Sequence, residues 1–163
     1  MSTEPNSTET ARPGESAEAT ANTLTMTRIF KAPRELVFAA WIDPDQLAQW
    51  WGPDHLHTPR ETVVVEPRVG GAWAATMVMD DNGMEFPSTG TFARFDPPNG
   101  FELRHEPNQF FAFSASVAVT FEDVDGGTRM TMVQHFDTES FDFGDSILGW
   151  GTQLEKLRRL LAV

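Results

Sequence analysis

The sequence contains no cysteine among its 163 residues. This absence excludes disulfide bonds, thiolate nucleophiles and cysteine-ligated metal sites together, and it fits a reducing compartment. The chain also lacks any apolar run approaching the roughly 20 residues of a membrane-spanning helix. Its first 22 residues have no apolar segment typical of a secretory signal. We therefore expect a cytoplasmic protein.

Basic residues are scarce as well. Lys and Arg together number 12 against 24 Asp and Glu, which gives a formal net charge of −12. Nucleic acids require a surface rich in Lys and Arg to neutralise their phosphates. Anionic membrane surfaces attract the same kind of positive patch. We therefore expect neither a nucleic acid nor a membrane as a partner.

The chain divides into two parts by composition. Residues 1–22 are polar and acidic, and such a segment cannot bury enough apolar surface to offset the entropy lost on ordering. We interpret 1–22 as a disordered acidic tail. Residues 23–163 are sufficient for one domain with a substantial core.

Periodicity predicts the elements of this domain. Residues 24–30 alternate as a strand does, and Pro33 stands at the start of a helical pattern. Asp43 is placed to cap a second short helix, which runs to the adjacent Trp50 and Trp51 and ends at the following Gly-Pro. Further strands are predicted at 61–67, 71–80, 85–98, 101–106, 110–123 and 128–136, and an amphipathic helix at 144–163.

This order predicts an α+β protein. Strands joined by tight turns form an antiparallel sheet, here of about six to seven strands. One long amphipathic helix at the C-terminus must then cover one face of the sheet. The two short helices come after the first strand.

Several motifs resemble those of one family, in the same order. They are "FKAPRELVFAAWIDPDQLAQWWGP" (30–53), "GGAW" (70–73), "GTFARFDPP" (90–98), "VTFEDVDGGTRMTM" (119–132) and "GWGTQLEKLRRLL" (149–161). The chain resembles the START-like (SRPBCC, helix-grip) superfamily, and within it the branch named for the activator of heat shock protein 90 ATPase homologue. The resemblance implies a curved sheet wrapped around the C-terminal helix, with a cavity between them and no fixed catalytic set.

Large apolar side chains are expected to line that cavity. Trp50 and Trp51 point about 100° apart on a helix, so both cannot enter one core layer. We expect Trp51 to face the cavity and Trp50 to pack against the outer edge or a neighbouring loop. The full predicted lining is Trp41, Trp51, Trp73, Met77, Met79, Phe111, Phe113, Met130, Met132, Gln134, Trp150 and Leu154. The alternative is that these residues simply fill the core.

The function expected from this lining is binding of a small hydrophobic or aromatic molecule. A cyclase or aromatase-like enzyme is a second possibility, acting by positioning with one acid/base residue, and Gln134 and His135 are candidates that no spacing fixes. A co-chaperone-like interaction module is a third. We nominate no catalytic residue, expect no cofactor, and expect a monomer or weak homodimer. His55 and His57 have a spacing that suits zinc, but nothing fixes a third ligand, so we expect no metal site.

Overall fold

The computed structural model describes residues 12–162 and confirms the α+β class. The elements are β1 (Ser16–Ala19), β2 (Thr23–Phe30), α1 (Arg34–Ile42), α2 (Pro44–Trp50), β3 (Leu56–His57), the 3-10 turn η1 (Arg60–Thr62), β4 (Val64–Val65), β5 (Ala72–Met79), β6 (Glu85–Asp96), β7 (Gly100–His105), β8 (Ala115–Val124), β9 (Gly127–Phe136) and α3 (Gly144–Leu161).

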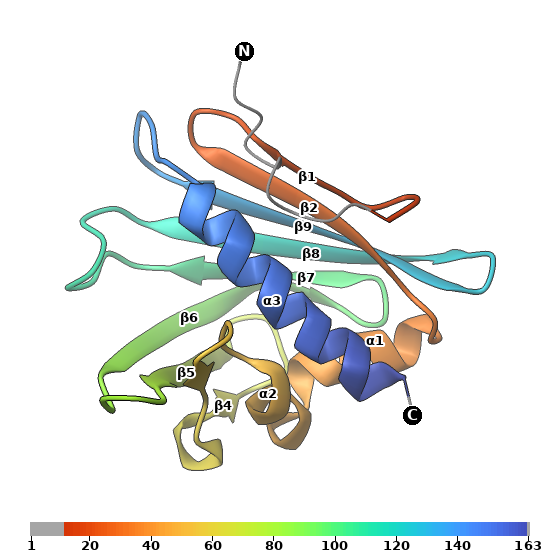
Figure 1. Ribbon diagram of the computed structural model, residues 1–163, viewed down its shortest axis with the longest axis horizontal. Helices are drawn as coiled ribbons and strands as arrows, with labels where there is room; N and C mark the ends of the chain where they lie inside the picture. The colour runs from red at the N-terminus through yellow and green to blue at the C-terminus, as the bar shows by residue number, and fades with distance from the viewer. Residues whose placement is uncertain (1–11, 163) are drawn as a thin grey trace.

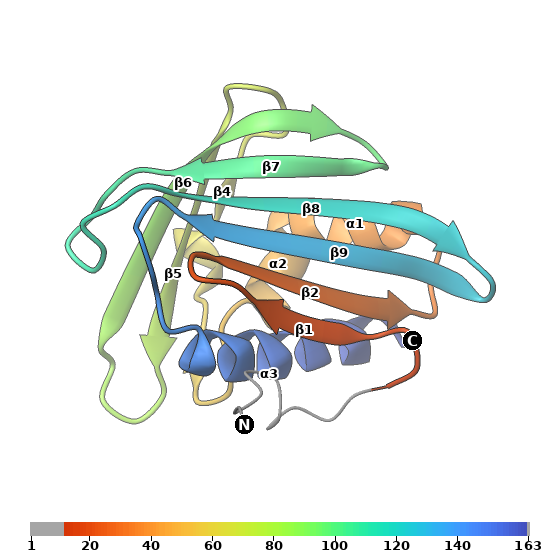
Figure 2. The same cartoon turned by 90° about the horizontal axis from the view of Figure 1, so that it is seen from above.

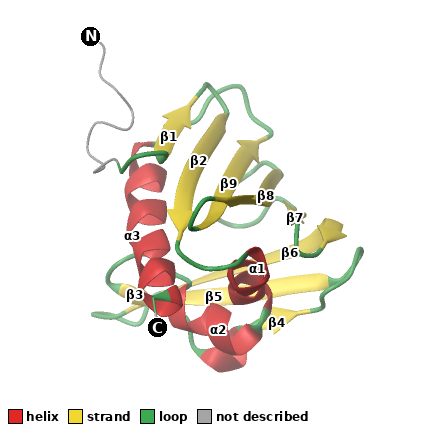
Figure 3. Ribbon diagram, turned by 90° about the vertical axis from the view of Figure 1, so that its right-hand side faces the viewer, coloured by secondary structure: helices red, strands yellow, loops and turns green. Residues whose placement is uncertain are grey.

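One curved antiparallel sheet contains all nine strands of the described residues. Its order is β1-β2-β9-β8-β7-β6-β5-β3, and β4 also pairs with β5. The sheet bends so that β5 and β6 turn away from the wall formed by β2, β9 and β8, and the helices lie on the concave side (Figure 3). The order confirms the predicted antiparallel sheet, which the short strands β1 and β3 enlarge. The strand predicted at 61–67 is reduced to β4, because Arg60–Thr62 form η1.

The C-terminal helix α3 crosses the concave face of the sheet, as Figures 1 and 2 show from two directions. Its buried residues Ile147, Leu154 and Leu157 recur at helical spacing and supply the apolar stripe that the sequence predicts. Among residues 12–162, no helix is long and apolar enough to cross a membrane.

Capping residues and prolines determine where the two short helices begin. Pro33 is the N-cap of α1, one position before the helix itself. Asp43 caps α2, because its carboxylate accepts a hydrogen bond from the Asp45 backbone N–H at 3.0 Å. Pro44 follows as the first helical residue, where the missing N–H costs nothing.

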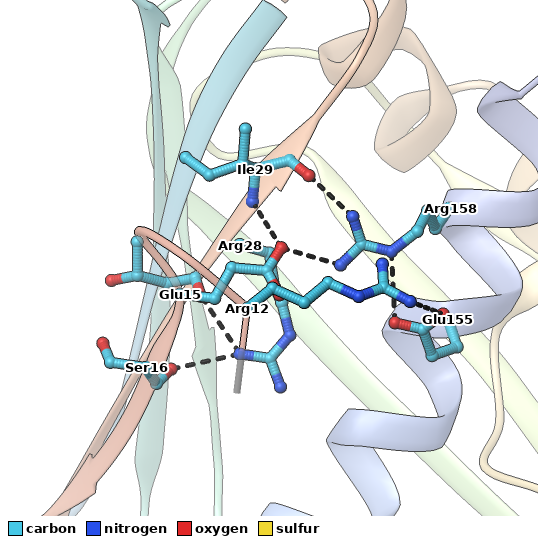
Figure 4. A network of polar contacts seen from close by, with 8 residues as sticks. Arg12, Glu15, Ser16, Arg28, Ile29, Glu155 and Arg158 are labelled. Carbon is cyan, nitrogen blue, oxygen red and sulfur yellow. Dashed lines mark hydrogen bonds and ion pairs between the residues drawn. The ribbon is translucent and has the colours of Figure 1, made fainter. Parts of the chain in front are cut away.

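The predicted disordered tail is wrong for the part that the structure describes. Ser16–Ala19 form the edge strand β1, which pairs with β2. The Glu15 carboxylate accepts hydrogen bonds from the Ile29 N–H at 2.9 Å and from Arg158 of α3 at 2.7 Å (Figure 4). This ion pair anchors the segment to both β2 and α3. Residues 1–11 of the predicted tail lie outside the described residues.

A second prediction is wrong at the start of β8. The apolar alternation from Phe110 predicts a strand, yet β8 begins only at Ala115. The reason is local: the Asn108 side-chain oxygen accepts hydrogen bonds from the N–H groups of Phe110 and Phe111, at 2.7 and 2.9 Å. Such a side chain competes with the strand ladder and holds the backbone in a turn.

Candidate functional site

All five tryptophans lie in one cluster, although four different elements or element ends supply them. Trp51, at the end of α2, is its centre. The centroid of the Trp51 ring system lies 5.0 Å from that of Trp73 on β5 and 5.5 Å from that of Trp150 on α3. Trp41 of α1 lies 6.0 Å from Trp51, and Trp50 lies 5.4 Å from it. The cluster therefore joins the short helices, the sheet and the long helix.

The paired tryptophans have different surroundings. Trp50 is fully buried, and its indole N–H donates to the Ala40 carbonyl at 2.9 Å. The expectation that Trp50 packs at an outer edge is therefore wrong, because Trp50 ties α2 to α1 inside the domain. Trp51 is only half-buried, and it contacts Trp73 and Trp150 across the concave side.

Three buried donors in this region have no hydrogen-bond partner within residues 12–162. They are the indole N–H groups of Trp41 and Trp51 and the amide nitrogen of Gln153. Trp41 and Gln153 are 1% and 4% exposed. Gln153 lies one turn of α3 beyond Trp150 of the tryptophan cluster. The three unpartnered donors therefore belong to the junction of the helices. A buried donor without an acceptor costs about 1–3 kcal/mol, so this junction favours an acceptor oxygen.

The concave face of the sheet is closed at one end and partly open at the other. At the closed end, the cross-strand row Phe101–Val119–Met132–Met26 is almost completely inaccessible to solvent. Toward the open end, several side chains on the same face are half-buried, although they are large and point inward, whereas Leu24 and Phe136 at this end are buried. The half-buried side chains include Met77, Met79, Phe86, His105 and Gln134.

The structure brings most of the predicted lining residues onto this face. Trp41, Trp51, Trp73 and Trp150 meet in the tryptophan cluster, and Met77, Met79 and Gln134 lie toward the open end. Met130, Met132 and Leu154 are fully buried in the closed part. The role of all these residues in ligand binding stays a prediction.

Phe111 and Phe113 lie on the β7–β8 loop and not on a strand. Both rings pack against Phe136 and Phe141, and Phe143 extends the same group. Phe111 remains exposed, whereas Phe113 is half-buried. This phenylalanine cluster covers the start of α3.

His105 is one of the polar residues of this face. It ends β7, and its ring lies 6.0 Å from Trp73 in an edge-on arrangement. Its Nδ1 lies 2.7 Å from the Thr89 carbonyl oxygen, which can only accept, so Nδ1 carries the proton. Burial lowers the pKa of His105 below its ordinary value of 6.5, although the hydrogen bond to Thr89 opposes this. The sequence pattern does not indicate that His105 lies beside Gly90 of the neighbouring strand.

The remaining histidines lie elsewhere. His135, one of the two candidates for an enzymatic role, lies on the outer face, where it contacts Thr23 at 3.0 Å and Asp137 at 3.2 Å. His57 pairs with Asp80 at an exposed position. Within the described part of the chain, no three His, Asp or Glu side chains are close enough together to hold a metal ion.

Asp137 gathers three polar side chains on the outer face. Ser114 donates a hydrogen bond to the Asp137 carboxylate, which lowers the pKa of that carboxyl group, and Arg104 and His135 act in the same direction. Ser114 has no contact with His135 among the described residues, so the group lacks the serine–histidine hydrogen bond of a nucleophilic site.

The loop that follows the paired tryptophans is held by α3. Lys156 donates to the carbonyl oxygens of Gly52, Pro53 and Leu56, at 2.7, 3.3 and 3.1 Å. Burial lowers the pKa of the Lys156 ammonium group, while Asp54 and Asp80 oppose that shift. Lys156 thus fixes the chain directly after Trp51.

Comparison with known proteins gives a match to one family model. The model of the family described as "Activator of Hsp90 ATPase homolog 1-like protein" matches residues 31–162. No match was found among curated proteins.

Solved structures share the fold at low sequence identity. A Chromobacterium violaceum protein has a TM-score of 0.80 at 22% identity, over 87% of this chain and 98% of its own. An Arthrobacter aurescens protein has a TM-score of 0.76 at 24% identity, over 90% and 91%. The AHSA1 protein of Silicibacter pomeroyi has a TM-score of 0.69 at 26% identity, over 86% and 97%.

Proposed function

Since the chain belongs to the family of activator of Hsp90 ATPase homolog 1-like proteins, whose helix-grip fold it shares, we propose that it binds a small apolar or aromatic molecule on the concave side of its sheet. The observation that carries this proposal is the half-burial of large inward-facing side chains at one end of that side. The row through Met132 in the closed part, in contrast, buries its side chains completely.

The chemistry of the partly open end suits a hydrophobic ligand. Methionines such as Met77 and Met79 adapt to irregular shapes, and Trp51 and Trp150 offer large flat surfaces. The unpartnered indole N–H groups of Trp41 and Trp51 add fixed donors beside these surfaces. A largely apolar lining with a few placed polar groups is typical of small-molecule sites.

Two measurements on the intact protein test this proposal. Native mass spectrometry after mild purification is expected to show a co-purifying small molecule. Isothermal titration calorimetry is expected to show binding of 2-methoxynaphthalene, a flat aromatic probe without an O–H group. If neither experiment detects a ligand up to low millimolar probe, the proposal is wrong.

A matched pair of variants on β8 locates the site. Ala115 faces the concave side, whereas Ala118 faces outward on the same strand. Ala115→Leu is expected to weaken probe binding at least tenfold by filling the space above the sheet. Ala118→Leu is expected to leave the affinity within twofold. Equal effects of the two substitutions would place the binding site elsewhere.

A further inference from the structure

A row of side chains across the concave face contains two very small residues. Trp73 of β5 pairs with Gly90 of β6, and His105 of β7 pairs with Ala115 of β8, which in turn pairs with Phe136 of β9. Gly90 lies directly beside His105, because its neighbour on β6 pairs with Arg104. The row therefore runs from one large aromatic residue to another, and His105 stands between the two small residues.

Gly90 determines where the imidazole lies. A Cβ atom at Gly90 would be 3.0 Å from two ring atoms of His105 and 3.0 Å from the Arg104 carbonyl oxygen. The His105 ring thus occupies the space that a side chain at Gly90 would take, and it leans toward Trp73. On its other side the row continues through Ala115 to Phe136.

The distance across Ala115 suits a ligand ring. His105 and Phe136 are two strands apart, which corresponds to about 10 Å between their backbones. Ala115 fills little of the space above the sheet between them. Phe113 packs against Phe136 at the far end of the row, so a ligand ring in this row would place its edge beside the imidazole.

The free nitrogen of His105 is a hydrogen-bond acceptor. The Nδ1–H group donates a hydrogen bond to the Thr89 carbonyl, which leaves the lone pair on Nε2. Within residues 12–162, Nε2 has no hydrogen-bond partner. Because burial also lowers the pKa of His105, the ring stays neutral at pH 7 and Nε2 remains an acceptor.

We propose that His105 selects the ligand of this site, and that the site prefers aromatic molecules that carry an O–H group, which donates to Nε2. This inference rests on the proposed function and adds its polar specificity. Gly90 and Thr89 position the imidazole, Trp73 supports one side of it, and Ala115 leaves room for the ligand ring. His105 acts here as a binding residue.

Two probes of nearly equal shape test the preference. 2-Naphthol carries an O–H group, and 2-methoxynaphthalene carries a methyl group on the same oxygen. Calorimetry on the intact protein at pH 7.5 is expected to give a dissociation constant about three- to tenfold lower for 2-naphthol, the effect of one net hydrogen bond. His105→Phe is expected to bring the ratio close to one, whereas His105→Gln, which keeps an acceptor near Nε2, restores part of it.

A spectroscopic measurement requires no substitution. With 15N-labelled histidine, the Nε2 resonance of His105 is expected to shift on addition of 2-naphthol and to move much less with 2-methoxynaphthalene. Equal affinity for the two probes, or an Nε2 resonance that responds equally to both, would overturn the role of His105 and leave the binding function standing. Failure of both probes to bind would overturn both proposals.

Discussion

Removal of the Glu15 carboxylate is expected to destabilise the whole domain, although Glu15 falls in a segment whose composition is that of a disordered tail. The Glu15 side chain is only 4% exposed, and that of Arg158 is 22% exposed. Glu15→Ala removes the hydrogen bonds to the Ile29 N–H and to Arg158. Within residues 12–162 it leaves the partly buried guanidinium group with Glu155, the Ile29 carbonyl and the face of the Phe30 ring as partners. Breaking a buried ion pair by removing one partner costs about 3 kcal/mol or more.

Urea unfolding followed by circular dichroism measures this effect. With a slope of about 2 kcal/mol per molar urea, the midpoint is expected to fall by about 1.5 M at unchanged slope. Glu18→Ala is the matched control, because Glu18 is an exposed glutamate on the adjoining strand β1, and its effect is expected to stay within about 0.5 kcal/mol. If the two variants unfold at the same urea concentration, Glu15 does not anchor the segment to α3. A double-mutant cycle with Arg158→Met then isolates the pair, and a coupling energy near zero would contradict the ion pair itself.

Three further predictions concern the site. Lys156→Met removes the donor shared by three loop carbonyls, so amide hydrogen exchange at Leu56 is expected to accelerate at least tenfold. An unchanged exchange rate would show that the loop keeps its conformation without Lys156. Trp50→Phe deletes the bond to Ala40 and leaves a small cavity, so the free energy of unfolding is expected to fall by about 2–3 kcal/mol in chemical denaturation; a loss below 0.5 kcal/mol would be inconsistent with that burial. The pKa of His105 is lower in the folded state than its ordinary value of 6.5, so the unfolded chain takes up the proton first and stability is expected to fall as the pH drops from 7 through 6.5 toward the lowered value. The His105→Gln variant is expected to lose this part of the slope, and parallel stability profiles for the two proteins would refute it.

Local patterns were sufficient to predict most of the elements. The alternation of β2 and the helical stripe of α3 follow from side-chain periodicity alone, and both are confirmed. Asp43 is a correct helix cap because its bond reaches only two residues along the chain. The loop before β8 shows the limit of periodicity, since one asparagine side chain outweighs an apolar alternation.

The features that sequence reasoning missed depend on partners far along the chain. Glu15 bonds to Arg158, 143 residues away, and nothing near Glu15 indicates that partner. Trp50 and Trp51 are neighbours, so their different surroundings depend on where β5 and α3 lie. The position of Gly90 beside His105 depends on strand register, which also shifts between Phe92 and Arg94 on β6. Register is a property of the assembled sheet and not of one strand.

The tryptophan cluster also has an optical consequence. Ring-system centroids 4.7 to 6.2 Å apart are close enough for the indole chromophores to couple as excitons and to pass excitation among themselves. The five residues therefore behave as one antenna, and light absorbed by any of them reports on the junction around Trp51. Near-ultraviolet circular dichroism should carry a coupled signal from this antenna, and a molecule that settles against Trp51 or Trp150 alone would alter the emission of the whole protein.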